Sequence, residues 1–293
     1  MANVIVASFF DDNFVSILNG VALGMLLFVL AIGLSLIFGL LDVLNLAHGS
    51  LYLLGTYLGY QLVEREGVPF IGAASITVVF GLALGLVLNA SLRPVRGRGH
   101  LDQALLTLGL LFIVGDLVTI IWGTEYFFIA PPHFLDRSVS ILGHIYPLYR
   151  IAVMVVGAVL FVLVYVLFER TQLGAILRAA VEDQTMVAGL GINVRLVMLA
   201  VLALGSALAT FAGVIGGPIL SVTPGVGDEV LILALIVIVI GGLGSIVGAF
   251  VGAIIIGEVQ TLGVALIPQI ASFALFGAMA IVLIVRPSGL FAR

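Results

Sequence analysis

Cysteine and lysine are both absent from this chain of 293 residues. Without cysteine, no disulfide, thiolate metal site or cysteine nucleophile can form. All eleven basic residues are arginines, which excludes a phosphate-binding-loop lysine, a Schiff-base lysine and a lysine general base. Charge of either sign is scarce, at 9% of residues, and the formal net charge of −4 gives no sign of a nucleic-acid partner.

There is also too little polar surface for a water-soluble fold. Soluble domains carry about 25% charged residues, whereas 62% of this chain is apolar and its mean hydropathy is +1.35. Eight apolar segments approach or exceed the roughly 20 residues with which a helix crosses a bilayer. They lie at about 14–38, 43–62, 68–92, 101–122, 147–168, 196–219, 230–257 and 270–285. Apolar and polar residues do not alternate within them, so we expect an all-α, polytopic transmembrane bundle, with 1–293 as a single domain.

The distribution of arginine predicts the orientation in the membrane. Arginines concentrate in 93–99, in 169–195 and at the C-terminal end, whereas the opposite loops hold fewer arginines beside several acids. The positive-inside rule therefore places these three segments in the cytoplasm. Asp11 and Asp12, with no basic residue before them, favour an N-terminus outside and argue against a cleaved signal peptide.

Eight full crossings would leave both termini on the same side, against this distribution. The run GGLGS at 241–245 resolves the conflict if it breaks the seventh segment. Three glycines in four residues are poor helix interior, and irregular backbone at membrane depth occurs where protein covers it or a wet cavity borders it. We expect one helix at about 229–241, another at about 245–263, and nine passages in all.

Small residues recur at every fourth position in three stripes. In lipid, such stripes let helix backbones approach closely. We interpret them as ordinary helix packing, in a compact bundle or at a subunit interface, rather than as substrate contacts. The stripes are Gly205, Ala209, Gly213 and Gly217; Gly244, Gly248 and Gly252; and Ser245, Ala249, Ala253 and Gly257.

Polar residues follow the first apolar segment at helical spacing. Asp42, Asn45 and His48 are three apart, so a continuous helix would place them on one face. Polar side chains in an apolar segment are costly unless paired or hydrated, so Asn45, His48 and Tyr52 are candidates for a translocation path. Alternatively, Asn45 and His48 cap or tether a helix break near the membrane surface. No second ligand lies at metal spacing from His48, so we expect no metal site.

Two acids, Asp116 and Glu258, lie in or at the end of apolar segments. An intramembrane acid suggests a proton or ion relay, which would make the chain an ion-coupled secondary transporter. A structural role near an aqueous end is the alternative, and a passive channel is a further one. No nucleophile elbow, zinc-protease motif or phosphate-binding loop occurs, so we expect no enzyme.

The polar stretch at 169–195 separates two long apolar segments. It predicts one or two short helices over 173–191, ended by the Gly189-Leu190-Gly191 turn. A solvated helix needs no partner, but the length, the position and a mixed apolar face favour docking into a groove on another protein. The residues of that face are Ala179, Ala180, Met186, Val187 and Leu190.

Six groups of short motifs occur in order along nearly the whole chain. They are Asn19-Gly20-Val21-x-Leu23-Gly24; Leu44-Asn45-Leu46-Ala47-His48-Gly49 with Tyr52 and Gly55-Thr56-Tyr57; Arg93-Pro94-Val95-Arg96; Gly174, Arg178-Ala179, Glu182-Asp183, Met186-Val187-Ala188 and Gly191-Ile192-Asn193; Gly241-Gly242-Leu243-Gly244-Ser245 with Gly248-Ala249; and Arg286-Pro287-Ser288-Gly289-Leu290. In this order the chain resembles the permease subunits of branched-chain amino acid ABC importers, the leucine/isoleucine/valine type. Ser50 departs from the family, whose members often carry glutamate there. Relatives import urea, amides or aromatic acids, so the solute stays open.

The resemblance implies partners that composition alone does not. Such a permease pairs with a second, related permease in a bacterial inner membrane. Two cytoplasmic ATPases, which bind ATP and Mg, power the pair, and a periplasmic or lipid-anchored binding protein delivers solute; no cofactor is expected on this chain. The implied ATPase-coupling residues are Arg178, Ala179, Glu182, Asp183, Met186, Gly189 and Gly191. Those implied near the substrate path are Asn45, His48, Tyr52, Gly241, Gly242, Gly244 and Ser245.

Overall fold

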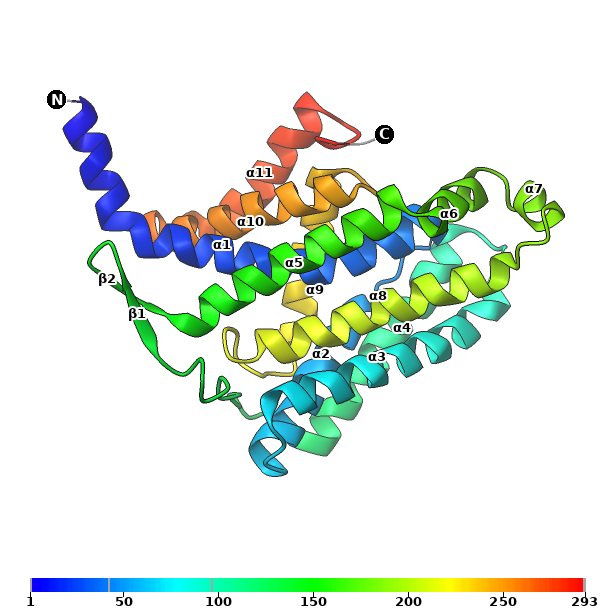
Figure 1. Ribbon diagram of the computed structural model, residues 1–293, viewed down its shortest axis with the longest axis horizontal. Coiled ribbons are helices and arrows are strands. Elements are labelled where there is room, and N and C mark those ends of the chain that lie inside the picture. Colours follow the sequence, from blue (N-terminus) through cyan, green and yellow to red (C-terminus); the bar gives the residue numbers. More distant parts are fainter. Residues whose placement is uncertain (1, 42, 96, 292–293) are drawn as a thin grey trace.

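The computed structural model describes residues 2–41, 43–95 and 97–291. Long helices lie side by side along one axis of the molecule (Figure 1). The first half contains α1 (Ala2–Leu41), α2 (His48–Tyr60), α3 (Phe70–Leu92), α4 (His100–Trp122) and α5 (Leu148–Arg170). Two short helices, α6 (Gln172–Glu182) and α7 (Gln184–Gly189), precede α8 (Val194–Gly216), α9 (Val226–Gly241), α10 (Ile246–Leu266) and α11 (Ala271–Val285). Every predicted apolar segment contains a helix, and the all-α bundle is confirmed.

The lengths of these helices decide which of them can cross a membrane alone. Within the described residues, seven helices are long and apolar enough to do so. The helix α9 has only 16 residues, and α2 has 13 before it continues as a π-helix over Gln61–Arg65. Both remain shorter than the roughly 20 residues that a full crossing needs. The count of nine passages therefore stays a prediction.

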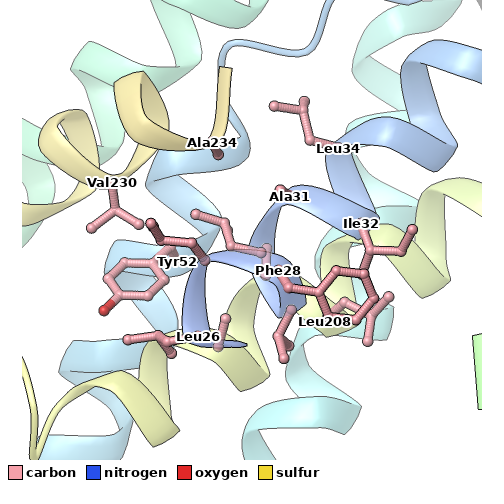
Figure 2. Packing of buried hydrophobic residues seen from close by; sticks show 14 of the residues in the cluster. Leu26, Phe28, Ala31, Ile32, Leu34, Tyr52, Leu208, Val230 and Ala234 are labelled. Carbon is pink, nitrogen blue, oxygen red and sulfur yellow. The ribbon is translucent and has the colours of Figure 1, made fainter. Parts of the chain in front are cut away.

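The first helix forms the centre of the bundle. In the most apolar 18-residue window of α1, 89% of the window is buried inside the protein. The corresponding share is 67% for α8 and 11–33% for the other five spans. The helix packs against α5, α8, α9 and α10. Figure 2 shows its residues Phe28 and Ile32 in one cluster with Tyr52 of α2, Leu208 of α8 and Val230 of α9. Side chains in this part of α1 thus face protein on nearly all sides, while α3, α4, α5 and α11 present apolar side chains outward.

The small-residue stripes pack helices together, as predicted. A Cβ added to Gly213 of α8 would lie 2.2 Å from the Tyr52 carbonyl oxygen, and one added to Gly257 of α10 would lie 2.3 Å from that of Gly20. Both distances are too short for real atoms. The α8 backbone can therefore approach α2, and the α10 backbone α1, only because these positions lack a side chain.

A small hairpin is the one described element that departs from the expected helices. Strand β1 (Ser138–Ile141) pairs with β2 (His144–Pro147) in antiparallel register, with Ser138 opposite Pro147. Leu142 and Gly143, both at positive φ, form the two-residue turn, which suits the right-handed twist of the strands. The hairpin leads directly into the start of α5 (Figure 1).

The connections gather at two opposite ends of the bundle (Figure 1). At one end, Trp122 donates to Gln61 (Nε1–Oε1 3.2 Å), and Glu64 accepts from the Ala130 amide (2.7 Å). The hairpin and the α8–α9 connection belong to this end. At the other end, Gly97 and Arg98 border one cavity with Ala188 and Ile192, and the Leu290 amide donates to the Ile240 carbonyl oxygen beside the break after α9. The described parts of 93–99 and 169–195, two of the segments predicted in the cytoplasm, therefore lie together.

Candidate functional site

The connection between α1 and α2 holds the first group of candidate residues. Asn45 lies in this connection and His48 is the first residue of α2. The prediction that Asp42, Asn45 and His48 share one helical face is therefore wrong, and Asp42 itself lies outside the described residues. Thr107 of α4 holds the connection in place, because its Oγ1 accepts from the Leu46 amide (3.1 Å) and lies 3.2 Å from the Leu44 carbonyl oxygen.

Asn45, His48 and Tyr52 are all completely buried, with 0% of each side chain exposed. The Nε2 atom of His48 donates to the Leu30 carbonyl oxygen at 3.0 Å, which joins α2 to α1 and supports the tether interpretation for His48. Within the described chain, no hydrogen-bond partner faces the Asn45 amide, the His48 Nδ1 or the Tyr52 hydroxyl. Buried polar atoms without partners are rare in folded proteins. Their place on a substrate path stays a prediction.

The glycine break between α9 and α10 lies where the sequence predicts it. Gly242 and Gly244 have φ values of +99° and +75°, a left-handed region that glycine adopts without strain. The Ser245 hydroxyl then accepts from the Gly248 amide at 3.0 Å and caps α10. A Cβ on Gly39 would lie 2.3 Å from the Gly244 Cα. The break thus packs on the end of α1, just before the connection that carries Asn45.

The segment 169–195 forms the predicted pair of short helices, α6 and α7. Arg178 donates to the Phe168 carbonyl oxygen and lies 3.7 Å from the Glu169 carboxylate, which fastens α6 to the end of α5. Asp183 accepts from the Met186 amide at 2.9 Å and caps α7. Both residues therefore build the segment itself, and their contact with an ATPase stays a prediction.

Apolar side chains of this segment point outward. Ala180 and Val187, which the sequence predicted on the docking face, are buried within the segment, so this part of the face is wrong. Met186 and Leu190 are exposed as predicted, and two further residues join them. The exposed apolar side chains are Leu173 (60%), Val181 (46%), Met186 (56%) and Leu190 (73%).

The remaining residues of the predicted coupling group add little to this face. Ala179 is half-buried on α6, and Gly189 and Gly191 are exposed around the end of α7. Glu182 ends α6, but its side chain lies outside the described part of the molecule. Four large apolar side chains of this segment are therefore exposed outside the membrane-spanning helices, and exposed apolar side chains in such a place can mark a protein interface.

The two intramembrane acids lie in separate places. Asp116 of α4 borders a cavity of about 270 Å³ together with Ser50 and Asp228. Glu258 of α10 packs beside Gly20 of α1, where a Cβ would lie 2.6 Å from the carboxylate. The structure does not bring Asp116 and Glu258 into one relay.

A larger cavity, of about 1090 Å³, lies between the end of α1, α4 and the start of α8. Arg98, Gln103 and Arg195 line it, and a neighbouring cavity of about 500 Å³ shares Arg195. Sequence reasoning used the two arginines only for orientation and missed Gln103. The available signal was a polar pair one helical turn apart, Gln103 and Thr107, in an otherwise apolar helix.

The amino-acid sequence is similar to those of known transport permeases. The protein-family model described as branched-chain amino acid transport system / permease component matches residues 16–285. The chain is 28% identical to the high-affinity branched-chain amino acid transport system permease protein BraD of Pseudomonas aeruginosa, over 94% of this chain and 95% of that protein. It is 27% identical to the LivH permease protein of the corresponding Escherichia coli system, over 94% of both chains. A probable LivH permease from Methanocaldococcus jannaschii is 29% identical over 81% of this chain and 76% of its own length.

Proposed function

Because the chain belongs to the family of branched-chain amino acid transport permease components, we propose that it is the membrane-spanning permease subunit of an ATP-driven importer. Its solute is a branched-chain amino acid or a related small polar molecule. The chain itself makes and breaks no covalent bond, and it carries no cofactor of its own. The structural observation that supports coupling to separate ATPases is the exposed apolar side chains of α6 and α7 at the arginine-rich end.

The partners follow from this proposal. Two cytoplasmic ATPases, with ATP and Mg, dock on α6 and α7, and a second, related permease completes the membrane unit. A periplasmic or lipid-anchored binding protein delivers the solute to the opposite end, where the hairpin and the start of α5 lie. The permease spans a bacterial inner membrane as one domain, 1–293, with its N-terminus outside and its C-terminus in the cytoplasm.

The contacts of α6 suggest how an ATPase would move the bundle. Arg178 fastens α6 to the last turn of α5, and α7 leads into α8 through the short connection that Asn193 ends. A displacement of α6 and α7 therefore pulls on α5 and α8, both of which pack against the central helix α1. Alternating access then corresponds to two packings of this bundle, biased by the ATPase dimer.

The proposal is tested by placing charge on the exposed face. A Met186→Glu, Leu190→Glu double variant should insert normally but lose co-purification with the ATPases, because a carboxylate cannot be buried unpaired in an apolar groove. Leu142→Glu, an equally drastic change at the hairpin turn, should leave ATPase association intact. Undiminished association of the double variant would remove α6 and α7 as the docking site.

Transport assays separate the proposal from its rivals. Solute uptake into proteoliposomes should require the ATPases and ATP, and Asp116→Asn should leave at least part of it. An ion-coupled transporter predicts uptake by this chain alone that the Asp116→Asn or Glu258→Gln change abolishes. A passive channel predicts flux without ATP or an ion gradient. Uptake by the permease alone would refute the proposed coupling.

A further inference from the structure

We propose that the groove between α3 and α5 binds a phospholipid with an ethanolamine headgroup, with one acyl chain in the groove and the phosphate at Arg137. The groove has a volume of about 280 Å³ and belongs to two helices that are long and apolar enough to cross a membrane. The inference requires only that the chain crosses a membrane. It is independent of the solute and of the ATPases in the proposed function.

The groove exists because α3 and α5 pack against different helices. In the described chain, α3 packs mainly against α8, whereas α5 packs mainly against α1. The two helices are joined near their starts, where the rings of Phe70 and Tyr149 meet edge to face with 6.0 Å between their centroids. Beyond this contact the groove is lined by the small residues Ala74 of α3 and Ala152 of α5. These alanines leave a gap between the two helices.

The gap lies at membrane depth. Its lining residues on α3 extend from Phe70 to Val78, a length of roughly 12 Å at the rise of an α-helix. Phe211 and Ile215 of α8 form the floor of the groove, because α8 runs between α3 and α5 (Figure 1). All of these residues belong to helices that can span a membrane, so the groove borders the hydrocarbon region of the bilayer.

The wall of the groove suits a hydrocarbon chain. Among its described lining residues, only Ser75 and Tyr149 carry polar side-chain atoms. Both hydroxyls are already hydrogen bonded: that of Ser75 donates to the Ile71 carbonyl oxygen (2.9 Å), and that of Tyr149 donates to the Ile215 carbonyl oxygen (2.7 Å). The wall therefore suits an apolar ligand rather than a polar solute. An empty apolar gap loses dispersion contacts, and in a bilayer an acyl chain is the molecule at hand to restore them.

The end of the groove at which α3 and α5 begin suits a phosphate. Arg137 is held there by two contacts. Its Nε donates to the carbonyl oxygen of Phe134 (3.1 Å), a residue that lines the groove, and its carbonyl oxygen accepts from the amide of Leu148, the first residue of α5 (2.8 Å). The Arg137 side chain is exposed, and the terminal nitrogens of a guanidinium bind phosphate oxygens in pairs. The starts of two long helices favour an anion at the same place.

One acid restricts the choice of headgroup. Asp136 directly precedes Arg137 in the chain and is exposed as well. A purely anionic headgroup would be repelled by this carboxylate, whereas an ammonium can donate to it. Phosphatidylethanolamine carries both a phosphate and an ammonium, so it matches the Asp136–Arg137 pair better than phosphatidylglycerol does.

A helix of a second permease is the other candidate for an apolar groove in a membrane. Such a helix would contact α3 or α5 along most of a span, whereas this groove is about two helical turns long and ends at Asp136 and Arg137. A molecule with an apolar chain and a charged head matches both parts. Bound in this way, the lipid connects α3 to α5 and stabilises the bundle, as does any ligand that binds only the folded state.

The test uses the full chain purified in a maltoside detergent. The probe is phosphatidylethanolamine with a photoreactive diazirine in one acyl chain. Cross-linked peptides should come from 70–78 and 149–156. Ala152→Phe should remove this labelling, because the phenyl ring occupies the groove. Ala158→Phe makes the same change at an exposed position of α5 outside the groove and should leave the labelling unchanged.

A second pair of variants tests the headgroup. Arg137→Gln should weaken probe binding by about two- to fivefold, the effect of an exposed charge pair. Arg65→Gln is the control, because Arg65 lies over the Tyr60 ring and does not line the groove. Since Arg137 is exposed, its replacement keeps the test valid even if Ala152→Phe fails to fold. The same probe with a glycerol headgroup should label less, and equal labelling would overturn the assignment of the headgroup.

Thermal unfolding gives an independent readout of the same site. Added phosphatidylethanolamine should raise the unfolding temperature of the unaltered protein. It should not raise that of Ala152→Phe, in which a side chain of the protein itself fills the gap. An equal rise in both would mean that the lipid stabilises the protein elsewhere, which would overturn the proposal.

Three further outcomes would overturn it. Labelling spread evenly over the exposed apolar faces of α4 and α11 would show lipid contact without a site. Labelling that survives both Ala152→Phe and Arg137→Gln would place the probe elsewhere. Ser75 is exposed and the chain has no native cysteine, so Ser75→Cys can be tested with a bismaleimide. Cross-linking between two copies in place of lipid labelling would assign the groove to a second permease.

Discussion

Among single residues, Gly213 shows how tightly the helices approach. Replacing it with alanine would put a Cβ 2.2 Å from the Tyr52 carbonyl oxygen and 2.7 Å from the Thr56 amide nitrogen. We expect Gly213→Ala to force α8 away from α2 and to lower the free energy of unfolding by about 1–3 kcal/mol, the usual cost of overpacking. Thermal unfolding of the detergent-solubilised protein measures it.

Gly109 supplies the matched control for this prediction. It lies within α4, and apart from the local helix backbone no atom of the described chain comes within 4 Å of a Cβ placed there. Gly109→Ala should leave stability unchanged or raise it by about 0.4–1 kcal/mol, because alanine loses less conformational entropy in a helix. Equal loss of stability in both variants would mean that the short contact at Gly213 is not the cause.

The residue scale also shows where sequence reasoning fails. The interval of three between Asp42, Asn45 and His48 favours one helix face. Residues 40–48 contain neither glycine nor proline, so the sequence has no local signal that would end a helix there. What holds the chain out of a helix is Thr107, more than 60 positions away, which contacts both Leu44 and Leu46. A local pattern contains no trace of such a distant partner. The sequence therefore offers a helix break at Asn45 and His48 only as the alternative to a shared helix face, and it does not identify Thr107 as the residue that holds the break.

At the scale of elements, the break between α9 and α10 depends on a backbone that only glycine adopts easily. Gly244 has a φ of +75°, and a Cβ there would lie 3.0 Å from the Gly39 Cα. We expect Gly244→Ala to destabilise the protein by about 1–2 kcal/mol, the cost of left-handed backbone for a residue with a side chain. ATP-driven uptake should fall as well, because the break packs on the end of α1.

Gly225, the residue before α9, serves as the comparison. Its φ is −81° and a Cβ there meets nothing within 4 Å, so Gly225→Ala should leave both unfolding temperature and uptake close to those of the unaltered protein. If Gly244→Ala left unfolding temperature and uptake unchanged as well, the backbone at position 244 would not need its positive φ, which would contradict the structure.

The elements that the sequence predicts share a strong local signal. Long apolar runs predict the helices, clustered glycines predict the break at 241–245, and the polar stretch predicts α6 and α7. The hairpin has weaker signals: its strands are four residues each and its turn pairs Leu142 with Gly143. The exposed side of α6 and α7 is predicted only in part, because it depends on the packing of α6 against α5 and of α7 against α6 and α8.

At the scale of the whole molecule, the two ends have different chemistry. One end carries the hairpin and the contacts of Gln61 and Glu64 with the 122–130 region. The other carries most of the arginines, the exposed apolar face of α6 and α7, and the large cavity. On the proposed function, a single bundle would separate a surface that receives solute from a surface on which the ATPases act, and α1 runs between the two ends (Figure 1).

This separation requires a definite orientation, which the absence of cysteine makes simple to measure, since no native thiol has to be removed. Single cysteines at Leu142, Gln172 and Ser288 would each lie on an exposed residue outside the spans. In intact cells, Leu142→Cys should react with a membrane-impermeant maleimide, while Gln172→Cys and Ser288→Cys should react only after the membrane is opened. Gln172 and Ser288 on the same side require an even number of passages between them. Because α8, α10 and α11 are each long enough to cross alone, α9 would then be the fourth passage, and α9 and α10 would cross separately on either side of the glycine break. Labelling of Ser288→Cys but not Gln172→Cys from outside would mean that 226–266 crosses only once, and the proposed C-terminal orientation would then be wrong.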